Sequence, residues 1–129
     1  MLKRSRLGEY CELMVKAKFI FHGFEVFPAN GHDSRADFIA MMDGEFYRVQ
    51  VKSGRLKNGK VVAQTCSRSS YGRRDYRGNA DLLAIWCIDT STCYLLPVSR
   101  ANKNEMHLRV SATKNNQLAG VKFANDYQI

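Results

Sequence analysis

Apolar positions recur with a helical period near the start of the chain. Residues 7–22 place apolar side chains three and four positions apart, which predicts a helix with one apolar face. The predicted face consists of Tyr10, Leu13, Met14, Ala17, Ile20 and Phe21. Gly23 follows and predicts the end of the helix, because glycine readily adopts the left-handed conformation that closes many helices.

Strand patterns follow the helix. Residues 24–27 alternate between apolar and polar positions, which predicts a first strand, and Pro28 to Gly31 breaks it. Residues 36–42 and 45–53 predict two further strands, separated by Asp43-Gly44. This dipeptide is typical of a tight hairpin turn, since both turn positions need a positive φ. The three strands are therefore expected to form a meander.

The middle of the chain has weaker patterns. Asn58-Gly59 predicts another hairpin, with residues 60–66 as its return strand. Residues 67–79 contain glycines and serines but no apolar periodicity, so we expect a long basic loop there. Long loops in small domains often carry function.

A continuous apolar run marks the centre of the expected sheet. Residues 82–88 have the composition of a strand buried on both faces. Residues 93–98 predict its neighbour, ended by Pro97, and residues 107–111 predict a short last strand. The order of elements predicts an α/β fold, with a mixed β-sheet and an N-terminal helix packed on it. The length suits one domain over residues 1–129.

Positive charge is concentrated in one segment. The formal net charge is +8, and residues 52–77 hold eight Lys and Arg side chains against the single acid Asp75, a difference of +7. Such a segment, with tyrosines among the arginines, predicts binding to the phosphate backbone of double-stranded DNA rather than a merely solvated loop. The predicted DNA-binding residues are Arg55, Lys57, Lys60, Arg68, Tyr71, Arg73, Arg74, Tyr76 and Arg77.

Other patterns exclude several classes of protein. No apolar run approaches 18 residues, so a membrane-spanning helix is not expected. The basic N-terminus lacks the apolar stretch of a signal peptide, which predicts a cytoplasmic location. The cysteines show no C-x-x-C spacing, so we expect reduced, structural thiols and no zinc site. They are Cys11, Cys66, Cys87 and Cys93.

Three residues suggest a reaction centre on the predicted hairpin. Asp37 begins one strand, and Gln50 and Lys52 share a face of the next, because residues two apart point the same way. The turn brings position 37 near position 50. A carboxylate, an amide oxygen and the Val51 carbonyl are oxygen ligands that suit Mg²⁺ or Mn²⁺. The lysine could stabilise charge during phosphodiester hydrolysis. One carboxylate makes a sparse site, and Glu12 of the helix is a candidate second acid.

This arrangement resembles the PD-(D/E)XK nuclease superfamily, in which an acid on one strand precedes an acid or glutamine, any residue and lysine on the next. The stretch from Gly8 to Leu13 and the following His22-Gly23-Phe24 are similar to the first helix of archaeal Holliday junction resolvases. Gln50-Val51-Lys52 resembles the branch that contains group I intron homing endonucleases. Later segments also resemble that branch, namely residues 76–78, 94–98 and 115–117.

The resemblance implies a restriction-endonuclease-like core and a role for each matching residue. Asp37 would be the principal metal ligand, Gln50 the second ligand, Lys52 the catalytic lysine and Glu12 an auxiliary ligand. Ala36 stands where the motif has proline, and Gln50 removes one negative charge, so metal binding would depend more on Glu12 and on substrate phosphate. Two cuts in a duplex need two centres, so a homo-oligomer, either a dimer or a tetramer, is expected.

Three functions fit these features. The first is a site-specific, Mg²⁺-dependent DNA endonuclease of the homing type. The second is a structure-selective resolvase that uses the same centre on branched DNA. The third is a DNA-binding module whose centre is inactive, which the neutral Gln50 keeps open. Simpler interpretations also exist for single residues, since Glu12 can pair with Lys16 one helical turn away.

Overall fold

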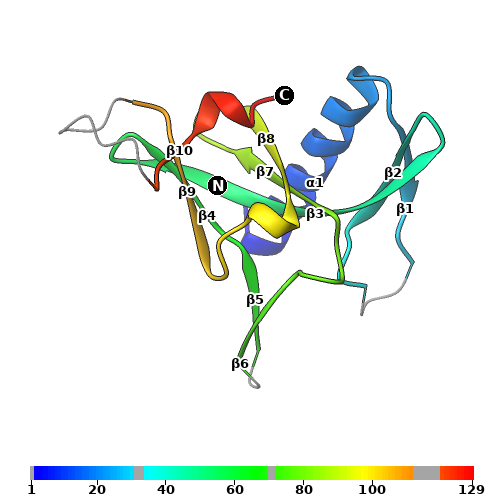
Figure 1. The fold of residues 1–129 in the computed structure, drawn as a ribbon, viewed down its shortest axis with the longest axis horizontal. Coiled ribbons are helices and arrows are strands. Elements are labelled where there is room, and N and C mark those ends of the chain that lie inside the picture. The colour runs from blue at the N-terminus through cyan, green and yellow to red at the C-terminus, as the bar shows by residue number, and fades with distance from the viewer. Residues whose placement is uncertain (1, 31–33, 70–71, 112–119) are drawn as a thin grey trace.

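The computed structural model describes residues 2–30, 34–69, 72–111 and 120–129, although not the side chains of residues 68 and 69. One helix, α1 (Arg4–Phe21), packs on a mixed sheet (Figure 1), so the predicted fold class is confirmed. The strands are β1 (Glu25–Pro28), β2 (Phe38–Met42), β3 (Glu45–Lys57), β4 (Lys60–Gln64), β5 (Cys66–Ser69), β6 (Gly72–Asp75), β7 (Leu82–Cys87), β8 (Thr92–Pro97), β9 (Glu105–Arg109) and β10 (Lys122–Phe123). Two short 3-10 turns are η1 (Val98–Arg100) and η2 (Ala124–Asp126).

Strand β3 holds the sheet together because it pairs with three others. Its first half pairs antiparallel with β2, and its far end pairs antiparallel with β4 on the same edge. Its opposite edge pairs parallel with β7 over residues 49–54. The pairing with β2 stops at Val49 and the pairing with β4 starts at Arg55. Among the described strands, therefore, none covers the edge of residues 50–54 between these two points.

Turn residues set the register of the two hairpins on β3. Asp43 and Gly44 have φ angles of 51° and 80°, and Asn58 and Gly59 have 50° and 75°. Both predicted tight turns are confirmed, since each dipeptide supplies the two positive φ angles of the turn. Strand β3 runs four residues past its predicted end at 53, because the second hairpin begins directly at its last residue.

The helix is confirmed, but its predicted buried face is wrong. Cys11, Val15 and Phe19 are the buried residues of α1. Leu13, Ile20 and Phe21 of the predicted face are instead 57%, 60% and 82% exposed. Apolar side chains occupy more than one side of this helix, so its sequence pattern alone does not select the packing face.

The predicted basic loop is also wrong. Strands β5 and β6 pair antiparallel, with Cys66 opposite Asp75 and Ser69 opposite Gly72. Figure 1 shows this β5–β6 hairpin extending away from the body of the molecule. A hairpin that packs on nothing along most of its length needs no apolar face, so it leaves no alternating pattern in the sequence.

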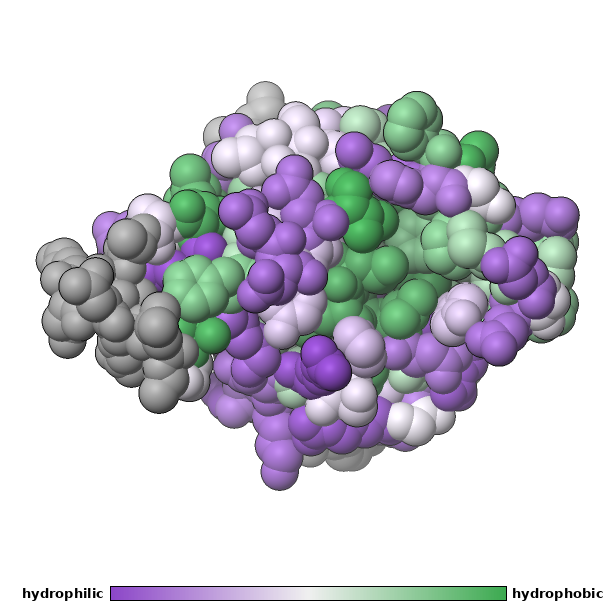
Figure 2. Space-filling view, turned by 45° about the horizontal axis from the view of Figure 1, so that its top comes forward, coloured by the Kyte–Doolittle hydropathy of each residue, from purple (hydrophilic) through white to green (hydrophobic). Residues whose placement is uncertain are grey.

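Two cores lie on opposite faces of the sheet. One is built under α1 and includes Phe19, Phe38 and Trp86, and the other includes Leu96 and Met106. Strand β7 contributes side chains to both, so its predicted burial on two faces is confirmed. Figure 2 shows the face that includes the top of Figure 1, where apolar side chains gather in a hollow with hydrophilic ones around it. All four cysteines are free and buried.

No helix in the described part of the chain is long and apolar enough to cross a membrane.

Substitution of Gly54 tests how tightly β3 packs against its neighbours. A Cβ atom there would lie 2.8 Å from Ile85 Cγ2 and 2.9 Å from Val61 Cγ1, which is too close. Gly54→Ala should lower the free energy of unfolding by about 1–3 kcal/mol, measured by urea denaturation. Gly8→Ala is the matched control, because no atom would lie within 4 Å of that Cβ. It should stabilise the helix by about 1 kcal/mol. Equal effects of the two changes would contradict this packing.

Candidate active site

Asp37 lies at the point where β2 separates from β3. Its N–H donates to the Val49 carbonyl at 2.8 Å, and its Oδ2 accepts from the Val51 N–H at 2.7 Å. Phe38 is the register partner of Val49, which places Asp37 opposite Gln50 as the sequence predicted. The carboxylate thus satisfies a backbone donor on the uncovered edge of β3.

Gln50 and the Val51 carbonyl meet at the same edge. The Val51 N–H points toward Asp37, so its carbonyl faces the same side of the strand. Gln50 Nε2 lies 3.2 Å from that carbonyl oxygen and donates to it. Because an amide can turn by half a rotation, Gln50 can present its oxygen in place of its nitrogen. Two oxygens from adjacent residues can therefore face the Asp37 carboxylate.

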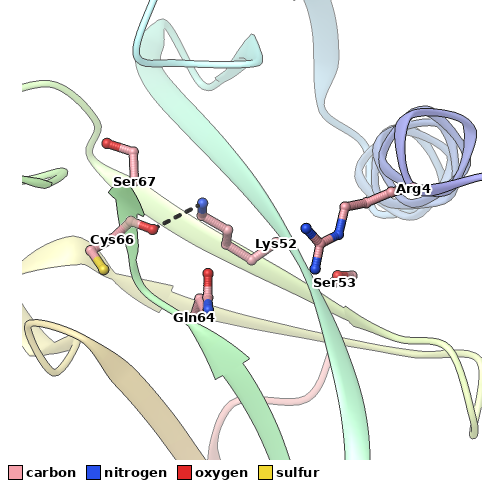
Figure 3. Close-up of a pocket in the computed structure, with 6 residues that line it drawn as sticks. All are labelled: Arg4, Lys52, Ser53, Gln64, Cys66 and Ser67. Atoms are coloured by element: carbon pink, nitrogen blue, oxygen red, sulfur yellow. Dashed lines mark hydrogen bonds between the residues drawn. The ribbon is translucent and has the colours of Figure 1, made fainter. Parts of the chain in front are cut away.

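Lys52 lines a pocket of about 670 Å³ beside this edge. Figure 3 shows its side chain directed at the Cys66 carbonyl, with Nζ 3.4 Å from the oxygen. Arg4 reaches the pocket from α1, on the opposite side of β3 (Figure 3). The described lining residues are Arg4, Lys52, Ser53, Gln64, Cys66 and Ser67. Two cations, two hydroxyls and an amide without an acid form a surface that suits an anion.

Glu12 approaches this centre from α1. Its Oε1 lies 3.0 Å from Lys16 Nζ, so the simple helix ion pair is present, and both side chains are half-buried. Burial raises the pKa of Asp37, while the Val51 N–H lowers it. The charge of Glu12 also raises the pKa of Asp37, and the charges of Lys52 and Lys16 lower it. The fold thus brings Glu12, distant in sequence, within electrostatic range of Asp37.

The oxygen donors at this edge fit a hard divalent cation. In the part of the chain that the structure describes, no three His, Cys, Asp or Glu side chains form a metal cluster. The available donors are the carboxylates of Asp37 and Glu12, the amide of Gln50 and the carbonyl of Val51. An all-oxygen set of this kind suits Mg²⁺ or Mn²⁺ and lacks the thiolates and imidazoles typical of zinc sites.

The predicted DNA-binding residues have different environments. Lys57, Arg73 and Arg74 are exposed, and Lys60 is half-buried at the start of β4. Arg55 pairs with Asp89 at 3.4 Å, and Arg77 pairs with Asp75 at 3.5 Å. Tyr71 and the side chain of Arg68 lie outside the described residues.

Tyr76 differs from its predicted role as a surface contact. Its side chain is only 5% exposed, because it belongs to the core beneath β7. The Arg35 guanidinium carbon lies 4.3 Å from its ring centroid, and Lys52 Nζ lies 4.9 Å from it. A residue so covered cannot stack on a base without a rearrangement. Its ring instead lies inside the fold, next to the Lys52 ammonium.

Arg35 is a residue that the sequence did not single out. Its guanidinium donates to Ser67 Oγ and to the carbonyls of Arg74 and Asp75, and so ties the segment before β2 to the β5–β6 hairpin. These partners are more than 30 positions away, so no local pattern could have indicated them. The only sequence feature that could have indicated Arg35 is its position two residues before Asp37.

Asp81 and Asp89 have structural roles at the ends of β7. Asp81 accepts from the Arg48 N–H and guanidinium, and the Arg48 hydrogen bond lowers the pKa of Asp81. Asp89 Oδ2 accepts from the Leu56 N–H at 2.7 Å. Both carboxylates therefore hold the β7 edge of β3 in place, one at each end of β7.

Comparisons with known proteins indicate a family and a shared fold. A family model described as PD-(D/E)XK endonuclease matches residues 2–129. The solved structure of a bacterial homing endonuclease, I-Ssp6803I, is similar, with a TM-score of 0.74 and 19% sequence identity. The match covers 98% of this chain and 89% of that chain. At this identity the likeness shows a shared fold. No curated protein matches the sequence.

Asp37→Asn should stabilise the metal-free protein at neutral pH. The amide oxygen can still accept from the Val51 N–H, but the buried charge is removed. Because burial raises the Asp37 pKa in the folded state, stability present in acid is lost as the pH rises through that pKa. The variant should therefore unfold at a higher temperature than the wild type at neutral pH.

Thermal unfolding in EDTA over a pH series would measure this difference. It should disappear below the ordinary carboxyl pKa of 3.8, where both proteins are neutral at this position. Asp43→Asn is the matched control, since Asp43 is exposed and asparagine tolerates its positive φ. Equal stabilities of Asp37→Asn and the wild type at neutral pH would contradict the buried charge.

Proposed function

We propose that this chain, which belongs to the PD-(D/E)XK endonuclease family, is a metal-dependent endonuclease that hydrolyses phosphodiester bonds in double-stranded DNA at specific sites. One observation supports this proposal most directly. Asp37, Gln50 and Lys52 lie together at the uncovered edge of β3, beside a pocket whose described lining holds no acid. Oxygen donors and cations therefore lie near one another at this edge. Phosphodiester hydrolysis needs both.

Each residue has a role in the proposed reaction. Asp37, Gln50, the Val51 carbonyl and Glu12 would hold Mg²⁺ or Mn²⁺. When bound, such a cation lowers the pKa of a coordinated water and offsets charge on the phosphoryl oxygens. Lys52 donates hydrogen bonds to the attacking water or to the phosphoryl oxygens and stabilises the negative charge that develops there. The half-buried setting of these side chains strengthens each electrostatic contact.

The pocket and the basic hairpin provide the proposed DNA contacts. Arg4, Ser53 and Ser67 line the pocket around Lys52 and can donate to phosphate oxygens. Arg73 and Arg74 are exposed on β6, and Arg74 is the register partner of Ser67, which lines the pocket. DNA affinity should therefore fall steeply with salt.

The homing type of endonuclease is the favoured subclass. The fold likeness to a bacterial homing endonuclease over nearly the whole chain supports it, as does glutamine in Gln50-Val51-Lys52. A site-specific enzyme cuts linear duplex DNA at one long sequence. Efficient cutting of four-way junctions with no preference for sequence would instead indicate the resolvase function.

Lys52→Met tests the centre. It should lower the single-turnover cleavage rate by about 10² to 10³ at saturating DNA, as loss of one charge-stabilising donor does in other hydrolases. Lys57→Met is the matched control, because Lys57 is an exposed lysine at the end of the same strand. It should weaken DNA binding at most.

Gel assays with Mg²⁺ and with EDTA give the rate, and filter binding gives the affinity. Wild-type cleavage by Lys52→Met would show that the centre is misassigned. Salt-dependent binding without any cleavage by the wild type would instead identify an inactive DNA-binding module.

A homo-oligomer is part of the proposal, since two cuts in a duplex need two centres. Helix α1 offers an exposed apolar face to a second copy, formed by Leu13, Ala17, Ile20 and Phe21. Burying such side chains between copies is favourable in proportion to the apolar area removed from water.

The double change Ile20→Glu with Phe21→Glu should therefore shift the protein toward the monomer. Each charge placed in an apolar interface costs several kcal/mol, so the dissociation constant should rise by about 10² or more. Sedimentation over a concentration series measures it. Phe46→Glu is the control, since Phe46 is 63% exposed on β3 and lies outside this face. An unchanged oligomer would exclude α1 as the interface.

A further inference from the structure

A single aromatic ring joins the proposed catalytic lysine to the β5–β6 hairpin. Tyr76 directly follows β6 in the sequence, and its side chain is buried. Two cations lie against it, namely Lys52 Nζ at 4.9 Å and the Arg35 guanidinium carbon at 4.3 Å from the centroid. Cations are attracted to the faces of aromatic rings, and the attraction is larger where water is partly excluded.

Neutral groups determine where the Lys52 ammonium lies. Among the described residues, no carboxylate forms an ion pair with it. Its contacts are the Cys66 carbonyl at 3.4 Å and the Tyr76 ring. A lysine side chain has four rotatable bonds and loses conformational entropy when it is fixed. Loss of either contact should therefore leave the ammonium in several positions.

Both contacts come from the base of the hairpin. Cys66 opens β5 and is opposite Asp75, which closes β6 next to Tyr76. Arg35 fastens this base by donating to Ser67 Oγ and to the carbonyls of Arg74 and Asp75. Arg35 also lies two residues before Asp37. The short segment from Arg35 to Asp37 therefore contains the proposed metal ligand and also holds the β5–β6 hairpin, whose base contacts Lys52.

We infer that Tyr76 and Arg35 are positioning residues for Lys52. The Tyr76 ring and the Cys66 carbonyl locate the ammonium, and Arg35 holds the hairpin base that presents them. Exposed arginines on β6 contact the DNA backbone, so the same hairpin binds substrate at its arms and places the lysine at its base. This inference rests on the proposed function, and it gives Tyr76 and Arg35 a part other than direct contact with DNA.

The kinetic test compares Tyr76→Leu with Tyr76→Phe. Phenylalanine keeps the ring face, whereas leucine keeps apolar volume without it. Tyr76→Leu should lower the single-turnover rate at saturating DNA about ten-fold, equivalent to roughly 1.4 kcal/mol, with DNA affinity nearly unchanged. Tyr76→Phe should cut at close to the wild-type rate. Equal rates for the two variants, each folded by circular dichroism, would overturn the inference.

A second measurement does not depend on cleavage. Protons on the terminal methylene of Lys52, which is bonded to the Nζ atom that lies over the Tyr76 ring, should show an upfield ring-current shift in NMR spectra of the free protein. Lys52→Arg assigns the signal by removing it. The shift should persist in Tyr76→Phe and be reduced in Arg35→Lys, which keeps the charge but loses the planar fork that spans three acceptors.

These readouts separate two kinds of failure. An unshifted Lys52 signal in the wild type, or a shift unchanged in Arg35→Lys, would overturn the positioning role whether or not the protein cuts DNA. A shifted signal with the expected variant pattern would support it even if Tyr76→Leu failed to fold. Absence of wild-type cleavage together with that pattern would overturn the proposed function and leave the contact between lysine and hairpin established.

Discussion

The hydrogen bond from the Val51 N–H to the Asp37 carboxylate is the interaction on which the site depends. Strand β3 spans two halves of the sheet, and its partners β2 and β4 leave a gap along one edge. An uncovered, partly buried N–H in that gap would cost free energy. Asp37 removes that cost with its side chain, which fixes the carboxylate within reach of Gln50 and the Val51 carbonyl. The same short gap that interrupts the sheet thereby creates a cluster of oxygen atoms.

The Asp37 carboxylate lies in a partly buried position, where burial disfavours its charged form. Burial raises the Asp37 pKa, and the nearby Glu12 raises it further. Lys52 and Lys16 act in the opposite direction but do not remove the shift. A fold optimised only for stability would place a neutral acceptor at this position. An acid in such an unfavourable position is common at functional centres, where stability is exchanged for chemistry, and it is consistent with the proposed role of Asp37.

Sequence patterns predicted those parts of the fold that local chemistry determines. Asp43-Gly44 and Asn58-Gly59 determine two hairpins, and the spacing around the first of them is enough to set Asp37 opposite Gln50. The face of α1 was not predictable, because Leu13, Ile20 and Phe21 make its outer side as apolar as its inner side. The β5–β6 hairpin buries too little to show an alternating pattern. Tyr76 and Arg35 depend on contacts between distant segments, which composition and spacing do not encode.

Local charge explains why the proposed centre would need its substrate. Asp37 and Glu12 contribute two negative charges, and Lys52 and Lys16 contribute two positive ones within electrostatic range of Asp37. The cluster is thus nearly balanced before a cation binds, and Gln50 adds no further negative charge. A divalent cation would leave an excess of positive charge that a DNA phosphate offsets. In the proposed function, cation and DNA would each bind more tightly in the presence of the other, which restricts an assembled centre to DNA that is already in the pocket.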